Sequence, residues 1–392
     1  MTVGLQHAGA DPLAAARELA PLAREGAGEA DANRRLSAEL EQGLRDSGLL
    51  RMLVPASLDG GEASPGQMVA AVEELARADG AAGWCLAVAC TGGVLAAFME
   101  PASAREVFGD PRGWVGGVFA PKGRAVPGPG GDLTVSGRWP FASGSAHCDW
   151  LMGGCLVQSG DDVRRLDSGA PDVRLALIPA AQTTIVDTWA VAGLRGTGSN
   201  DFEVADAVVP EARTVSLISD KAREPGPLYA FPAFGLLALA IGAVGLGLAR
   251  GAVDDLKALA AGKVPAMATK VLADQPDTQM RLARAEAGLR AAHAYVDAAI
   301  GEAWEQAVDR HDVDLERRAG LRLAASHAMA TAAGVVDEMY SLGGGSSVYE
   351  TSPLQRRHRD IHVATQHMLV NPSTWEFAGR VLLGAPVRSE QF

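Results

Sequence analysis

Apolar residues recur at helical spacing from residue 11 to about residue 110, in runs such as DPLAAARELAPLAREGAGEA. Asp11 followed by Pro12 is a helix start signal, because it supplies an N-cap side chain and then a proline in the first turn. The later run GWCLAVACTGGVLAAF is apolar on nearly all sides, which predicts a central, buried helix. We therefore expect residues 1–110 to form a helical domain.

The pattern changes at about residue 111. Short alternating runs such as DLTVSGRW and DFEVADAVV are separated by clusters of Gly, Pro and Asp, which is typical of an antiparallel β domain and indicates a small β-barrel over residues 111–225. Long helical runs return over residues 226–392 and are long enough for a four-helix bundle. The predicted fold class is α+β, as one compact unit of three parts.

Composition narrows the possible partners. The formal charge of -12 and the pI near 5.2 disfavour nucleic acid and anionic membrane surfaces, which both require clustered Lys and Arg. The run FPAFGLLALAIGAVGLGLA resembles a membrane span, but it is rich in Gly and Ala and contains a proline, so we interpret it as a buried helix. The charge therefore favours a small-molecule ligand. Four cysteines without C-x-x-C spacing and the absence of an N-terminal leader pattern predict a cytoplasmic protein.

Aromatic and hydroxyl side chains are concentrated in GRWPFASGSAHCDW, which contains Trp139, Phe141 and Ser143. Flat rings beside small hydroxyls suit an isoalloxazine ring, but they equally suit a β-domain core with a serine-rich turn. The glycine-rich turn GLRGTGSNDFEV, with Thr197 and Ser199, does not lie between a strand and a helix and so is no dinucleotide fingerprint.

Three of the eight histidines lie in LQRRHRDIHVATQHML. His358 and His362 are four positions apart and share one helix face. We expect no metal there, because the glutamate of the H-E-x-x-H motif is missing and Arg356, Arg357 and Arg359 surround the pair.

If that helix continues to His367, Asp360 and His367 lie two turns apart on the same face. One acid and one imidazole would then point the same way. The alternative is structural: Arg359 and Asp360 form an ion pair, and His367 stabilises the helix C-terminus, which Pro372 shows to be near.

Four stretches, GWVGGVFAPKGRA, VSGRWPFASGSAHCDWLMGGC, TWAVAGLRGTGSNDFEV and LGGGSSVYETSPLQRRHRD, occur in an order that resembles the acyl-CoA dehydrogenase superfamily. Within it the chain is most similar to the oxygenase components of two-component flavin monooxygenases. The resemblance implies the same fold: an N-terminal helical domain, a central antiparallel β domain and a C-terminal four-helix bundle. It extends over nearly the whole chain.

The dehydrogenases of this superfamily carry a catalytic glutamate where this sequence has His367, Met368 and Leu369. Without that carboxylate a thioester loses the base that removes its α-proton, although Glu286 on another helix could replace it. Several flavin hydroxylases have a histidine in this region. The histidine in place of the catalytic glutamate therefore favours oxygenation, with His367 and Ser143 as catalytic residues, over dehydrogenation.

The resemblance also implies a cofactor, reduced FAD or FMN supplied by a separate reductase, and O2 as co-substrate. O2 would form a flavin C4a-hydroperoxide, hydrogen-bonded by Ser143, and His367, with a pKa near neutrality, would deprotonate an aromatic substrate or orient the distal oxygen. The remaining contacts expected from the resemblance are Trp139, Phe141, Thr197 and Ser199 at the flavin, Trp84 at the substrate cavity, and Gly344 and Gly345, which a neighbouring subunit would contribute in a homotetramer or dimer.

Other functions remain open at this point. The chain could be an acyl-CoA dehydrogenase, an oxygenase that acts on nitrogen or sulfur, or a helical scaffold that has lost its flavin. Trp84 could likewise be core packing and not a cavity residue.

Overall fold

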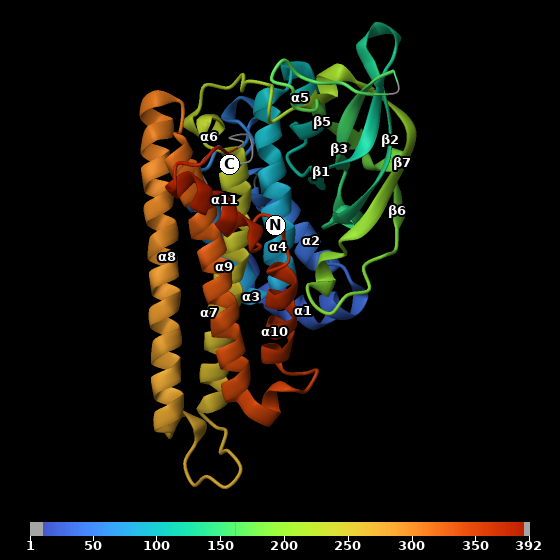
Figure 1. Ribbon diagram of the computed structural model, residues 1–392. Coiled ribbons are helices and arrows are strands. Elements are labelled where there is room, and N and C mark those ends of the chain that lie inside the picture. The colour runs from blue at the N-terminus through green and yellow to red at the C-terminus, as the bar shows by residue number, and fades with distance from the viewer. Residues whose placement is uncertain (1–10, 161, 388–392) are drawn as a thin grey trace.

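The computed structural model describes residues 11–160 and 162–387. An eight-stranded sheet lies on one side of the molecule and the long C-terminal helices lie on the other, with α4 between them (Figure 1). The first ten residues, which contributed to the expected cytoplasmic location, lie outside the described residues. The order of helices, sheet and helices confirms the predicted fold class.

The N-terminal part is helical, as its periodicity predicts. Its helices are α1 (Pro12–Asn33), α2 (Ala38–Asp46), α3 (Pro65–Ala78), α4 (Gly80–Gly92) and α5 (Pro101–Phe108). The predicted start is confirmed, since the Asp11 carboxylate accepts a hydrogen bond from the Leu13 N–H at 3.1 Å and Pro12 opens the helix. Asp79 ends α3 and caps α4, whose residues are almost all buried. Helix α4 packs against α3, α7 and β1, so it is the central helix expected from its sequence.

The sheet consists of β1 (Val115–Pro127), β2 (Asp132–Ala142), β3 (Trp150–Ser159), β4 (Asp162–Val163), β5 (Val173–Pro179), β6 (Thr184–Val186), β7 (Asn200–Pro210) and β8 (Thr214–Val215). The strand order is β6-β7-β2-β1-β3-β5-β8, and β4 pairs with β3. The pairings are antiparallel apart from β1 with β3, a departure from the expected wholly antiparallel sheet. It arises because β2 returns along one edge of β1 and the chain then crosses to the other edge.

The C-terminal part contains α6 (Pro227–Ala230), α7 (Ala233–Ala260), α8 (Pro276–Arg310), α9 (Leu315–Gly343), α10 (Pro353–Ala364) and α11 (Ser373–Leu382). Helix α9 packs against α7, α8, α10 and α11, so it is the centre of the bundle. Helix α7 also packs against α3, which joins the bundle to the N-terminal helices.

Within residues 11–160 and 162–387, two helical segments are long and apolar enough to cross a membrane by composition, Gly80–Phe98 and Ala233–Ala260. The protein itself covers them, because 89% and 94% of their apolar windows are buried. The second segment contains most of the run FPAFGLLALAIGAVGLGLA, so its interpretation as a buried core helix is confirmed.

The end of α10 differs from the assumption made for the C-terminal histidines. The helix stops at Ala364, and His367 lies in the turn that follows. Asp360 and His367 therefore do not share a helix face. Pro372 lies eight residues beyond the last helical residue, so it marked the boundary only coarsely.

Candidate active site

Four of the predicted site residues form one buried hydrogen-bonded cluster. The Trp84 indole N–H donates to the Ser143 hydroxyl oxygen at 2.9 Å. The hydroxyl oxygens of Ser143 and Ser199 are 2.7 Å apart, and those of Ser199 and Thr197 are 2.6 Å apart. All four residues are at most 7% exposed. Side chains from α4, from the turn after β2 and from the loop before β7 thus meet at one point, which we call the Trp84–Ser143 cluster.

The direction of these hydrogen bonds follows from counting protons. The Thr197 hydroxyl donates to the Leu194 carbonyl oxygen at 2.8 Å, which uses its single proton. Ser199 must then donate to Thr197, and Ser143 must donate to Ser199. Ser143 accepts from Trp84 and keeps one free lone pair, so it presents an acceptor to any ligand that approaches.

The local chain explains how Ser143 reaches this position. Strand β2 ends at Ala142, and Gly144 has φ +70°, a left-handed conformation that favours glycine. This turn brings the Gly144 N–H within 2.8 Å of the Thr197 carbonyl oxygen, to which it donates. The backbone itself therefore ties the serine turn to the glycine-rich loop.

His367 lies beside the same cluster. Its ring centroid is 5.5 Å from that of Trp84 in an edge-on arrangement with an interplanar angle of 77°. The His367 Nδ1 atom accepts a long, 3.4 Å hydrogen bond from the Leu369 N–H, which favours the tautomer with the proton on Nε2. Sequence reasoning combined His367 with Asp360, whereas the aromatic partner in the structure is Trp84.

The pKa of His367 is not near neutrality as the sequence suggested. Desolvation, and secondly the positive charge of Arg322, lower the pKa of His367 to about 4. The imidazole is therefore neutral at physiological pH. It can accept or donate a hydrogen bond, but its protonated form is disfavoured. No sequence signal pointed to Arg322, which lies 45 residues earlier, on α9.

Ser145 is a further polar residue at this turn that sequence reasoning did not select. Its hydroxyl oxygen is buried and has no hydrogen-bond partner among the described residues. Buried hydroxyls are normally hydrogen-bonded, so this atom is available to a ligand or a water molecule at this turn. The free lone pair of Ser143 and the unpartnered Ser145 provide the polar contacts that a flavin ring edge needs, and the residues present fit that cofactor. The Ser-Gly-Ser spacing of this turn was the available signal.

Among the described residues, the side chains of Trp139 and Phe141 make their contacts outside this cluster. Trp139 is 0% exposed, its ring stacks on Phe202 with centroids 4.7 Å apart, and its N–H donates to the Gly154 carbonyl oxygen at 2.7 Å. Its location is thus a correction to the expected flavin contact, since the ring is fully buried in the β-domain core. Phe141 is 69% exposed and lies edge-on to Trp189, so only Phe141 keeps a surface available for a ligand.

Gly344 and Gly345 lie apart from the cluster in the same chain. Both are exposed in the turn between α9 and α10, and Gly344 has φ +51°. His367 follows the opposite end of α10, and a helix of 12 residues is roughly 18 Å long. The two glycines and His367 therefore cannot contact the same small group within one chain.

Asp360 holds the backbone of a loop and does not share a helix face with His367 as the sequence suggested. Its carboxylate accepts a hydrogen bond from the Leu194 N–H at 2.5 Å. Burial, and secondly the nearby Asp79 carboxylate, raise the pKa of Asp360 to about 7. The suggested ion pair with Arg359 is wrong, because Arg359 pairs with Asp31 at 3.2 Å.

The alternative dehydrogenase base is also poorly suited to proton abstraction. Glu286 forms ion pairs with Arg250 at 2.7 Å and with Arg290 at 2.6 Å. The hydrogen bond from Arg250, and further contacts with Arg290, lower the pKa of Glu286 to about 2. A carboxylate bound by two guanidinium groups is a weak base. With His367, Met368 and Leu369 at the other candidate position, neither location supplies a free carboxylate.

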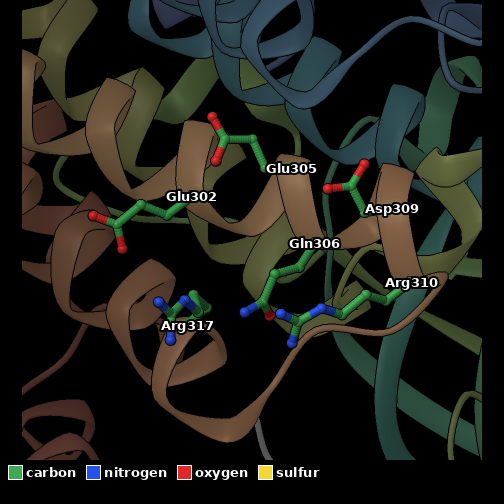
Figure 2. A pocket seen from close by; sticks show the side chains of 6 residues that line it. All are labelled: Glu302, Glu305, Gln306, Asp309, Arg310 and Arg317. Carbon is green, nitrogen blue, oxygen red and sulfur yellow. The ribbon is translucent and has the colours of Figure 1, made fainter.

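A hollow of about 230 Å³ lies elsewhere, on the surface between α8 and α9 (Figure 2). Polar and charged side chains line it: Glu302, Glu305, Gln306, Asp309, Arg310 and Arg317. None of the predicted site residues is among them, and Gln306 and Arg317 are both bonded to Asp314. We therefore take the Trp84–Ser143 cluster, and not this hollow, as the candidate active site.

Comparison with known families agrees with the architecture. Residues 14–107 match the acyl-CoA dehydrogenase N-terminal domain, and residues 239–372 match the acyl-CoA dehydrogenase C-terminal domain. The solved structure of 3-HSA hydroxylase from Rhodococcus sp. RHA1 superposes with a TM-score of 0.89 at 27% identity and covers 98% of this chain and 100% of that one. The matched domains and the fold thus place the chain in the acyl-CoA dehydrogenase superfamily.

Curated relatives specify the branch. Indole-3-acetate monooxygenase of Pseudomonas putida is 34% identical over 91% of this chain and 90% of its own length. The oxygenase subunit HsaA of a flavin-dependent monooxygenase of Rhodococcus jostii is 29% identical over 90% of this chain and 93% of its own length. The chain belongs to the flavin-dependent monooxygenases of the acyl-CoA dehydrogenase superfamily, which confirms the resemblance found in the sequence.

Proposed function

We propose that this protein is the oxygenase component that hydroxylates an aromatic small molecule of indolic or phenolic type, using reduced FAD or FMN and O2. The bound reduced flavin supplies two electrons, so that one oxygen atom of O2 enters the substrate and the other leaves as water. The observation that carries the proposal is the Trp84–Ser143 cluster with the neutral imidazole of His367 beside it. Relatives named for indole-3-acetate and for resorcinol support the substrate class.

Ser143 and Ser145 would hold the polar edge of the flavin. Ser143 offers a lone pair, which suits the N5–H that a reduced flavin carries, and Ser145 offers a hydroxyl that lacks a partner among the described residues. Thr197 and Ser199 would fix the orientation of Ser143 through the hydroxyl chain. Burial of these groups excludes water, which protects a reactive oxygen species from wasteful release as hydrogen peroxide.

His367 and Trp84 would line the substrate side. A neutral His367 with its proton on Nε2 can orient an oxygen atom through that N–H, and after a tautomer change it can accept a proton from a phenol or an indole N–H. The Trp84 ring supplies an apolar surface that suits an aromatic substrate. The low pKa of His367 favours the orienting role over permanent charge.

A separate reductase would supply the reduced flavin, as the designation of relatives as oxygenase subunits or components indicates. We further propose a cytoplasmic homotetramer or dimer in which the exposed turn with Gly344 and Gly345 meets the flavin of a neighbouring subunit. The distance of that turn from His367 along α10 supports this arrangement.

The decisive experiment mixes the protein anaerobically with chemically reduced FAD or FMN and then adds ¹⁸O2 and indole-3-acetate or resorcinol. We expect a product that carries one ¹⁸O atom, together with little hydrogen peroxide. Bleaching of bound oxidised flavin by an acyl-CoA without O2 would instead establish a dehydrogenase. Oxygen found on nitrogen or sulfur of a heterocyclic probe would indicate an N- or S-oxygenase, and a protein that binds neither flavin would be a scaffold.

A further inference from the structure

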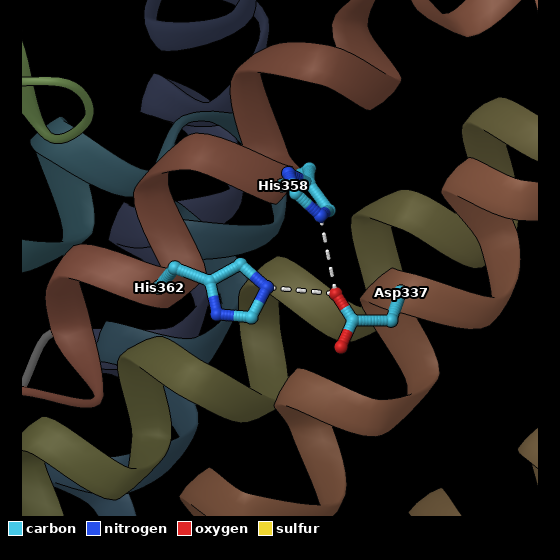
Figure 3. Close-up of side chains that lie close together, drawn as sticks. All are labelled: Asp337, His358 and His362. Carbon is cyan, nitrogen blue, oxygen red and sulfur yellow. Dashed lines mark hydrogen bonds and ion pairs between the residues drawn. The ribbon is translucent and has the colours of Figure 1, made fainter.

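Two histidines on α10 and one aspartate on α9 converge outside the candidate active site (Figure 3). The Nε2 atoms of His358 and His362 lie 3.3 and 2.8 Å from the same Asp337 carboxylate oxygen. The three potential ligand atoms lie within 4.8 Å of one another. Both imidazoles point toward the carboxylate from one helix face, as the spacing of four residues allows.

The arginines that argued against a cation from sequence point elsewhere. Arg357 forms an ion pair with Asp255 and donates to the Arg77 carbonyl oxygen, while Arg359 forms an ion pair with Asp31. Arg356 lies on another side of the helix, together with Asp31, Asp79 and Asp360. Each guanidinium group therefore lies on another side of α10, so the electrostatic objection to a cation at His358 and His362 no longer holds.

The residues around His358 and His362 hold the possible ligands in place and leave them accessible. The Tyr340 ring stacks on His358 with centroids 4.4 Å apart, which holds the imidazole in place. The side chains of His362 and Asp337 are each 48% exposed, which leaves access for an ion and its water ligands.

We propose that Asp337, His358 and His362 bind a divalent transition-metal ion of the zinc class, with water completing the coordination. Two imidazoles and one carboxylate are ligands that Zn²⁺ prefers, and ligand atoms at tetrahedral angles around zinc are roughly 3.3 Å apart. The separation of His358 from Asp337 already has that value, and the separation of His362 needs to widen by about half an ångström.

Such an ion would clamp α10 to α9. Helix α10 carries Asp360, which anchors the loop of the Trp84–Ser143 cluster, and leads into His367. The clamp is therefore a stabilising site at a distance from the chemistry. It is independent of the identity of the substrate and of the flavin.

The test uses tag-free full-length protein stripped with a chelator and then titrated with Zn²⁺ alone in competition with a chromophoric chelator. We expect one equivalent of Zn²⁺ per chain and a higher Tm in its presence. Co²⁺ in place of Zn²⁺ should give the intense visible absorption of a tetrahedral nitrogen and oxygen site. The variants His362→Ala and Asp337→Asn should bind more than about tenfold more weakly, because even the loss of an outer partner costs about 10- to 100-fold.

His293→Ala is the matched control. His293 also contacts two carboxylates, but Glu73 binds its Nε2 atom at 2.9 Å and Asp297 binds its Nδ1 atom at 3.0 Å, so they cannot converge with it on one ion. Zinc binding should survive this change. The assignment would be overturned if the parent took up no zinc. It would also be overturned if both site variants took up as much zinc as the parent while the unfolding curves of the metal-free proteins stayed the same. The three side chains would then form only a shared hydrogen-bonded group.

Discussion

Replacing Ser143 with alanine tests the cluster, because this hydroxyl links two buried partners. The change removes the acceptor of the Trp84 N–H and the donor to Ser199. Ser199 still donates to Thr197, whereas the Trp84 N–H is left unsatisfied in a residue that is 7% exposed. An unsatisfied buried donor costs about 1–3 kcal/mol, so we expect the free energy of unfolding to fall by about that amount.

A double-mutant cycle isolates this interaction. Trp84→Phe removes the N–H and keeps an aromatic ring beside His367, so adding it to Ser143→Ala relieves the unsatisfied donor. We expect the combined loss of stability in urea unfolding to be smaller than the sum of the single losses by about 1 kcal/mol. Additivity within about 0.5 kcal/mol would refute the hydrogen bond on which the cluster depends.

The same variants separate structure from chemistry. We expect Ser143→Ala to divert flavin oxidation from product to hydrogen peroxide, measured as the ratio of the two at saturating reduced flavin. Ser136→Ala is the control, because this serine lies on β2, the strand that leads into the Ser143 turn, and its hydroxyl bonds to the exposed Asp206. If both variants kept the parent ratio, Ser143 would have no part in oxygen transfer.

Three further outcomes follow from the structure. Because the pKa of His367 is lowered to about 4, product yield per flavin should show no inflection between pH 6 and 7, and an inflection that His367→Gln abolishes would contradict this. Because the pKa of Asp360 is raised to about 7, the folded state holds a proton that the unfolded state releases near pH 4. The free energy of unfolding should therefore fall as pH rises from about 4 to about 7, by at most about 1.4 kcal/mol per pH unit, and level off above pH 7. Urea unfolding of Asp360→Asn should lack this component; equal slopes would refute it. Trp139→Phe should cost about 1–3 kcal/mol, since the Gly154 carbonyl oxygen loses its partner, and should leave flavin affinity unchanged in fluorescence titration, whereas a large loss of affinity would restore Trp139 as a cofactor contact.

Periodicity predicted the order of helices, sheet and helices because it reports local burial. The sequence also predicted the burial of α4 and the start of α1 at Asp11, because helix caps and apolar helix faces depend on residues only a few positions apart. The parallel pairing of β1 with β3 was not, because strand direction depends on where the intervening chain crosses the sheet.

The sequence predicted which residue types the candidate site contains, but not which of these residues contact one another. Trp84 and Ser143 are 59 positions apart, and no spacing rule connects them. Trp139 matched a ring-binding pattern equally well from the core, where Phe202 covers it. The pKa of His367 depends on burial and on Arg322, which are tertiary features. The charges of the arginines on α10 could likewise be predicted from the sequence, but the directions in which their guanidinium groups point could not.

Helix α10 meets the cluster from two sides, and this explains why its position should control the site. Asp360 holds the Leu194 N–H, and the Leu194 carbonyl oxygen accepts the last proton of the hydroxyl chain from Thr197. Beyond the end of the same helix, His367 contacts the Trp84 ring, at the other end of that chain. The helix and the cluster thus form a closed loop of contacts, so a displacement of α10 must strain either the hydroxyl chain or the imidazole. Substitutions that loosen α10 should therefore uncouple flavin oxidation from product without touching the cluster itself.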